Sequence, residues 1–150
     1  NTGVPWAGTF AGDPLAAAVA LRQLQILIEE NYTARAAELG GYLMQHLQRL
    51  KENYEIIGDV RGKGLFVGIE IVKDRTSKAK DGPMMHRIRW NALEEGLIIA
   101  GGTNVLKMFP ALIISPAEID EAIDKLERAI RRALNGEPQG ISVFTESTVQ

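Results

Sequence analysis

The 150-residue sequence contains no cysteine, and this absence excludes disulfides, zinc fingers and thiol catalysis. It holds only two histidines, His46 and His86, so we expect no metal centre. No apolar run approaches the ~20 residues that a transmembrane helix needs. Neither sign of charge is in large excess, because 17 basic and 19 acidic residues leave a formal net charge of −2. Nothing in this balance suggests nucleic acid or an anionic membrane as a partner.

The remaining composition is that of an ordinary globular protein, with 45% hydrophobic and 24% charged residues. A chain of this length can bury one sizeable core, so we expect one domain. Residues 1–12 are loop-like and lack a basic region followed by an apolar one, so we expect no signal peptide and a cytoplasmic location. The sequence starts on turn residues without a methionine, which suggests a piece of a longer protein.

Four segments have helical patterns. Asp13-Pro14 is a typical helix start, and Ser115-Pro116-Ala117-Glu118 forms a capping box with proline at the first helical position. The predicted helices span about 14–30, 33–52, 83–95 and 116–134. The first is apolar around most of its circumference, which indicates burial on several sides. The second contains Gly40-Gly41, a pair that weakens a helix and that we attribute to close approach of a neighbouring helix.

Short apolar segments predict strands at 56–57, 65–72, 97–100 and 105–109. Turns are predicted at Gly58-Asp59 and at 101–104, and residues 60–64 are interpreted as a glycine-rich approach to a strand. The strand at 65–72 is apolar on both faces, so it is central or covered on both sides. Helices and strands are interspersed without strict alternation. This order favours an α+β fold: a mostly antiparallel sheet of three or four strands with helices packed on it.

One segment has the features of an anion site. Gly8 and Thr9 run directly into the helix that starts at Asp13, where free N–H groups and the helix dipole favour a phosphate. The segment 61–64, Arg-Gly-Lys-Gly, precedes a strand instead of opening a helix, so it is interpreted as a turn with two basic side chains. Glu70 is a lone acid on a strand, and no partner carboxylate can be placed beside it. A plain loop and cap remain the alternative for Gly8 and Thr9.

Several ordered blocks resemble one known family. GTFAGDPLAAAVALRQLQILIEEN is similar to the segment that class III, pyridoxal-phosphate-dependent aminotransferases carry shortly after their cofactor lysine. The likeness continues through RAAELGGYL, IIGDVRGKGLFVGIEIVKD, ALEEGLII, NVLKMFPALIIS and AEIDEAIDKLERAI, in the family's order and spacing. It covers roughly residues 5–134, and so many ordered blocks are far more specific than a single motif.

The resemblance implies the small C-terminal domain of a fold-type I enzyme that uses pyridoxal 5′-phosphate (PLP). Residues 1–12 would end a loop of the large domain, 13–134 would form the small domain with its leading interdomain helix, and 135–150 would be a polar tail. The family's Schiff-base lysine lies upstream of residue 1, and none of the seven lysines here stands at its motif. By itself, the chain is therefore expected to be inactive, while the longer enzyme would be a homodimer that transfers an amino group from an amino acid or ω-amine to a keto acid.

The same resemblance assigns site residues. Thr9, with Gly8, matches the threonine that binds the cofactor phosphate of the neighbouring subunit. Lys107 stands where many members have an arginine that binds the substrate carboxylate, but a lysine is a point charge and makes no bidentate clamp. A strand residue that only faces solvent remains the alternative for Lys107. Ala111 replaces the second proline of that motif, and Trp6 is placed to line the substrate pocket. Two alternatives remain open: an aminomutase or amino-acid racemase of the same family, and a free-standing non-catalytic binding module.

Overall fold

The computed structural model describes residue 8 and residues 11–136, and the chain divides into two compact units, residues 1–35 and 36–150. In the first unit, helix α1 spans Pro14–Glu29, and the Leu15 amide donates to Oδ1 of the N-cap Asp13 over 3.1 Å. This confirms the predicted cap. None of the residues of α1 is buried, so the burial predicted for this apolar helix is not found in the described structure. The predicted domain limits, 13–134, stay a prediction.

The second unit is an α+β structure built around one antiparallel sheet. Its sheet has the strand order β1-β2-β4-β3, so β2 is a central strand as predicted. The elements are α2 (Tyr32–Asn53, which begins in the first unit), β1 (Ile57–Lys63), β2 (Phe66–Ile71), α3 (Gly82–Glu94), β3 (Ala100–Gly102), β4 (Val105–Met108) and α4 (Pro116–Leu134). The predicted α+β fold, with a mostly antiparallel sheet of three or four strands, is thus confirmed, and the sheet has four strands.

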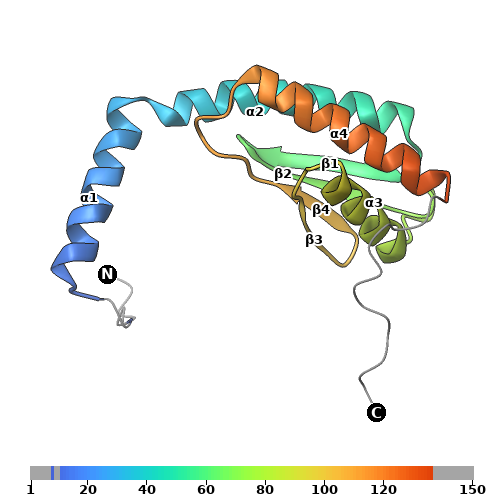
Figure 1. Cartoon of the computed structure of the whole chain (residues 1–150), viewed down its shortest axis with the longest axis horizontal. Coiled ribbons are helices and arrows are strands. Elements are labelled where there is room, and N and C mark those ends of the chain that lie inside the picture. The colour runs from blue at the N-terminus through green and yellow to red at the C-terminus, as the bar shows by residue number, and fades with distance from the viewer. Residues whose placement is uncertain (1–7, 9–10, 137–150) are drawn as a thin grey trace, which may run out of the picture. The chain divides into compact units, whose positions relative to one another are not determined.

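One face of the sheet is covered by helices, and this covered face holds the core. Helices α2 and α4 lie side by side over it, joined by hydrogen bonds between their side chains, and α3 packs against α4 (Figure 1). Strand β2 alternates between the faces, because Val67, Ile69 and Ile71 are buried while Phe66 is 61% exposed. The helices contribute buried residues at helical spacing, chiefly Leu43, Leu47, Leu50, Met85, Ile88, Ile119, Ile123, Leu126 and Ile130. The opposite side, which we call the open face, carries Arg61, Phe66, Glu70, Lys107 and Phe109.

The first strand is longer than the sequence predicts. Gly58 and Asp59, predicted as a turn, lie inside β1, where the register shifts between Ile57 and Asp59. This bulge lets Ile57 pair with Ile71 while Asp59 pairs with Glu70. Gly58 fits here because a Cβ on it would come within 2.7 Å of Val72 Cγ1. The Arg-Gly-Lys segment at 61–63 is therefore strand and not turn, so that interpretation was wrong.

The third strand is also displaced from its predicted place. Residues 97–99 precede it, and Gly101 and Gly102 belong to β3, although they were predicted as part of a turn. The chain reverses at Thr103, whose φ of 52° lies in the left-handed region. Gly101 accepts a strand position because Met85 Sδ packs where a side chain would stand, 2.9 Å from a Cβ built there.

In the glycine pair of α2, Gly40 and Gly41, the close contact is not with a helix as predicted. A Cβ on Gly40 would lie 2.3 Å from the carbonyl carbon of Gly64, in the connection between β1 and β2. Gly40 is buried, whereas Gly41 is exposed and a Cβ on it would meet no atom within 4 Å. The close neighbour is thus a hairpin connection and not a helix.

Arg75 ties the loop after β2 to the end of α2. Its guanidinium donates to the main-chain oxygens of Lys51, Tyr54 (3.2 Å) and Ile57 (3.2 Å), and it pairs with Glu55 at 3.3 Å. The last carbonyls of a helix have no partners within the helix, so one side chain here satisfies groups that would otherwise need water.

Replacing Arg75 with alanine should destabilise the protein by about 2 kcal/mol, because hydrogen bonds that involve a charged group contribute about 1.5–3 kcal/mol and do not add fully. The free energy of urea unfolding measures the effect. The control is Glu121→Ala, which removes an i,i+4 ion pair with Lys125 at 2.6 Å from a side chain that is 63% exposed and should cost less than 1 kcal/mol. Equal losses in the two variants would contradict the role of Arg75.

Candidate functional site

The predicted anion site at the start of the chain is described only in part. Gly8 is exposed, and a Cβ built on it would meet no atom within 4 Å, while Thr9 lies outside the described residues. The Ala11 amide donates to the Gly8 carbonyl over 2.9 Å, and Gly12 adopts a positive φ of 84°. Gly8 is thus uncrowded, and the phosphate contact of Gly8 and Thr9 stays a prediction. The carboxylate of Asp13 already accepts the Leu15 amide at the helix end, so a phosphate would depend on the groups of Gly8 and Thr9.

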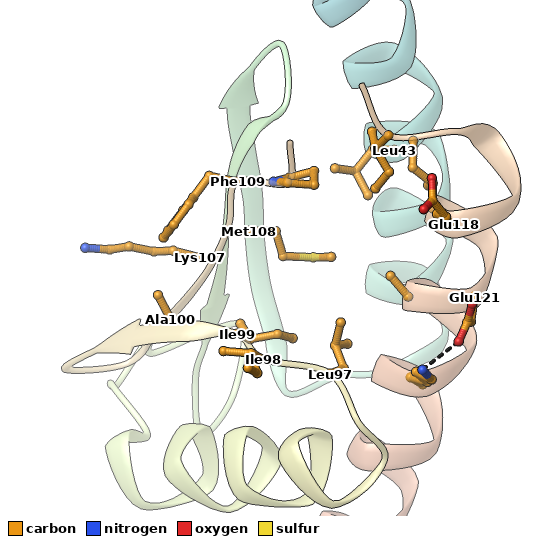
Figure 2. Close-up of a pocket in the computed structure, with 15 residues that line it drawn as sticks. Leu43, Leu97, Ile98, Ile99, Ala100, Lys107, Met108, Phe109, Glu118 and Glu121 are labelled. Atoms are coloured by element: carbon orange, nitrogen blue, oxygen red, sulfur yellow. Dashed lines mark ion pairs between the residues drawn. The ribbon is translucent and has the colours of Figure 1, made fainter. Parts of the chain in front are cut away.

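Lys107 stands on the open face among small residues. It lies on β4, opposite Gly68 of β2 and Ala100 of β3, so its two cross-strand neighbours carry little or no side chain. In Figure 2 its side chain points away from α2 and α4, on the opposite side of the strand from Met108. The ammonium group makes no ion pair with any residue in the described ranges. Lys107 is therefore an available cation, as a carboxylate-binding residue must be.

A surface hollow with a volume of about 650 Å³ lies around Lys107. Toward one end lie Phe66 and Phe109, whose ring centroids are 6.0 Å apart at a tilt of 41°. The hollow is lined by Arg61, Gly62, Phe66, Val67, Gly68, Glu70, Lys80, Gly102, Thr103, Asn104, Val105 and Lys107. An apolar aromatic pair and a free cation on one surface can bind an organic anion through both its charge and its carbon chain.

A polar network crosses the open face next to Lys107. Arg61 Nη1 donates to Asp59 Oδ2 (2.9 Å) and Glu70 Oε2 (3.0 Å), and Asn104 Nδ2 donates to Glu70 Oε1 (3.4 Å) and the Ile71 carbonyl (2.9 Å). The hydrogen bond from Arg61 is the main cause that holds the pKa of Asp59 below its ordinary value. Arg61 is thereby neutralised by two carboxylates, which leaves Lys107 better placed than Arg61 to attract a ligand anion.

A second hollow of about 430 Å³ opens on the covered side, between the end of the sheet and α4 (Figure 2). Leu97, Met108 and Leu43 are among the apolar side chains that face it, and Glu118 and Glu121 stand at its rim. Its walls are mostly apolar, and the Lys125 ammonium that lines it is already paired with Glu121 at 2.6 Å. Lys107 also borders this hollow, but its ammonium points to the opposite side of the sheet (Figure 2). The apolar hollow is therefore a poorer candidate than the hollow around Lys107.

The two histidines take structural positions. His46 lies in the seam between α2 and α4, with Nε2 3.4 Å from Asp120 Oδ1 and its ring edge-on to Tyr42. His86 is exposed on α3. Within the ranges that the structure describes, no three His, Cys, Asp or Glu side chains gather where they could hold a metal ion.

Sequence reasoning missed part of this site. Phe66, Phe109 and Asn104 were not predicted as site residues from the sequence, and Arg61 was assigned to a turn. The alternation along 66–70 and 105–109 places the side chains of Phe66 and Phe109 each on one face of its strand. It brings them together on one surface only once β2 and β4 are known to pair with Gly68 opposite Lys107. Glu70, for which no partner carboxylate could be placed from the sequence, accepts hydrogen bonds from Arg61 and Asn104.

Comparison with known proteins identifies the family. The profile described as "Aminotransferase class-III" matches residues 2–130. The chain belongs to the class III aminotransferase family. A leucine/methionine racemase of Thermococcus litoralis is 45% identical over 123 residues, which are 81% of this chain and 28% of that protein. The resemblance stated from the sequence blocks is thus confirmed.

Solved structures of class III transaminases share the fold. An (S)-enantioselective omega-transaminase from Thermomicrobium roseum is 38% identical with a TM-score of 0.78, over 89% of this chain and 31% of that one. A PLP-bound amine transaminase from an uncultivated Pseudomonas species is 30% identical with a TM-score of 0.81, over 87% of this chain and 30% of that one. The chain thus spans less than a third of the length of the three relatives named here.

Proposed function

We propose that this chain is the C-terminal part of a longer, PLP-dependent class III aminotransferase, in which Lys107 binds the carboxylate of the substrate. The observation that carries the proposal is the Lys107 ammonium group on the open face, which has no ion-pair partner among the described residues and lies inside a region that matches the family throughout. The proposed enzyme is a cytoplasmic homodimer that uses an amino donor and a keto-acid acceptor. In the part of the chain with described coordinates, no helix has the length and apolar character that crossing a membrane requires.

PLP, when bound, supplies an electron sink that stabilises negative charge at the carbon next to the amino group. This chain contributes binding groups to that chemistry. Gly8 and Thr9 would hold the cofactor phosphate through an amide and a hydroxyl, and Lys107 would orient the substrate by attracting its carboxylate. The lysine that carries the cofactor belongs to the family's upstream segment, so the 150 residues without that segment are expected to show no amino transfer.

An amino-acid racemase is the second candidate, because the racemase relative is 45% identical to this chain. One experiment separates the two activities. The complete protein is incubated with L-leucine, with and without pyruvate, and the products are separated on a chiral column. Alanine formed only with pyruvate supports the aminotransferase, whereas D-leucine formed without an acceptor supports the racemase. Absence of both products in the PLP-loaded protein would overturn both proposals and favour a non-catalytic module.

Thr9→Ala should weaken PLP retention by the complete dimer about tenfold or more, because a hydrogen bond to a charged group contributes about 1.5–3 kcal/mol. Thr9→Ser keeps the hydroxyl donor and should retain most of the affinity. Thr33→Ala removes an exposed hydroxyl from α2 and serves as the control. PLP affinity is measured by equilibrium dialysis, and equal values for all four proteins would remove Thr9 from the cofactor site.

A further inference from the structure

Asn104 joins two strands at the point where the chain enters β4. Its side-chain amide donates to the Ile71 carbonyl over 2.9 Å, and the Ile71 amide donates back to the Asn104 carbonyl over 2.8 Å. The residue is 2% exposed, so these groups have little access to water as an alternative partner. Because a buried polar group left without a partner costs about 1–3 kcal/mol, this arrangement strongly favours one position of Asn104 relative to β2.

The consequence is a fixed register between β2 and β4. With Asn104 bonded at Ile71, Val105 pairs with Glu70 and Lys107 pairs with Gly68. Side chains of a strand alternate between the two faces, so a slip of one residue would turn Lys107 toward the core and Met108 toward solvent. The strands at this edge are short, since β3 has three residues and β4 has four, so few backbone pairs add to the contribution of Asn104 and of the buried side chains of β4.

Arg61 and Glu70 support the same contact from the other side. The second amide hydrogen bond of Asn104 goes to Glu70 Oε1, while Glu70 Oε2 accepts from Arg61, which is held in turn by Asp59. The chain of contacts therefore runs across β1, β2 and the start of β4, and Arg61, Glu70 and Asn104 themselves line part of the hollow around Lys107. No ion pair in the described ranges joins Arg61 or Glu70 to Lys107, so their effect on its position passes through the backbone.

We propose that Asn104, braced by the Arg61–Glu70 pair, is a positioning residue that fixes the strand register in which Lys107 faces the substrate. The proposal deepens the assigned role of Lys107 and rests on the proposed function for its catalytic consequence. Its structural half, the register itself, can be tested without substrate or cofactor.

Thiol labelling tests the register, because the 150-residue chain has no cysteine of its own. Lys107→Cys should react fast with a maleimide and Met108→Cys slowly, since Met108 is 8% exposed. Adding Asn104→Ala should raise the labelling rate of Met108→Cys at least tenfold, and adding Glu70→Gln should raise it by a smaller factor. The matched control is Asn91→Ala, which removes another fully buried asparagine, one that donates to the Ala129 carbonyl of α4 over 3.3 Å. It should destabilise the fold without exposing residue 108.

Leucine and its amide, leucinamide, test the catalytic consequence in the complete enzyme, because they differ in the carboxylate that Lys107 would bind. Asn104→Ala should raise the KM for leucine about tenfold and change that for leucinamide less than twofold, and it should add no further loss in a Lys107→Met background. A structural defect alone would instead lower kcat/KM for both compounds.

The outcomes separate the two proposals. Labelling of Met108→Cys that is unchanged by Asn104→Ala, or that rises equally with Asn91→Ala, overturns the positioning role, whatever Lys107 does. Labelling that rises as expected while Lys107→Met leaves leucine unaffected supports the register and overturns only the proposed role of Lys107.

Discussion

Gly40→Ala should destabilise the protein by about 3 kcal/mol, whereas Gly41→Ala, one residue along the same helix, should stabilise it by about 0.5–1 kcal/mol. The added methyl group at residue 40 would lie 2.3 Å from the Gly64 carbonyl group, and main-chain atoms cannot rotate away as a side chain can. At residue 41 the methyl group enters open space, so only the better helix propensity of alanine remains.

The pair of variants forms its own control, because both make the same chemical change in α2. The free energy of unfolding in urea, obtained from the transition midpoint and slope, measures both effects. Two variants that shift the midpoint in the same direction would contradict the contact between Gly40 and Gly64. Gly64 itself has a positive φ of 56°, so the connection has limited freedom to move away from α2.

Lys107→Met should lower kcat/KM for leucine in the complete enzyme by ten- to a hundredfold. The estimate follows from the about 1.5–3 kcal/mol that a charged hydrogen bond contributes, with about 1.4 kcal/mol for each factor of ten. Methionine keeps the unbranched apolar stem and lacks only the terminal ammonium group, so the loss reports on that charged group. Lys107→Arg should keep or raise the value, since a guanidinium can bind a carboxylate through two parallel hydrogen bonds.

Lys73→Met is the control for a general loss of positive charge, because Lys73 is exposed and follows β2 on the loop. It should leave kcat/KM within about twofold of wild type, as exposed charges contribute little. If Lys107→Met also stays within twofold, Lys107 is an ordinary surface residue, and the substrate carboxylate is bound elsewhere in the enzyme.

The helices could be predicted from the sequence because their signals are local. Asp13, Pro14 and the Ser115–Glu118 capping box mark the helix starts, and the structure places α1 and α4 at those positions. The strands at Gly58 and at Gly101-Gly102 were missed because glycine is rare in strands and usually marks a turn. What makes these glycines strand residues is a neighbour distant in sequence: Val72 for Gly58 and Met85 for Gly101.

The only residues of the candidate site that could be assigned from the sequence were those that stand at a motif of the family. Lys107 was assigned by its motif, and the structure adds its surroundings: Gly68 on one side, Ala100 on the other. The partners of Glu70 depend on a register set partly by the bulge at Gly58, which no local pattern reveals. A single sequence gives residue types and spacing, but cross-strand neighbours follow from the pairing of whole strands.

The seam between α2 and α4 affects when the protein can fold during its synthesis. Tyr42 donates to Asp120 over 2.7 Å and Tyr54 to Glu127 over 2.9 Å, contacts that join residues 78 and 73 positions apart. The apolar side of α2 therefore stays without its partner helix until α4 has left the ribosome. A nascent chain stalled before residue 116 would display Leu43 and Leu47 to chaperones and proteases, and the arrival of α4 ends that exposure.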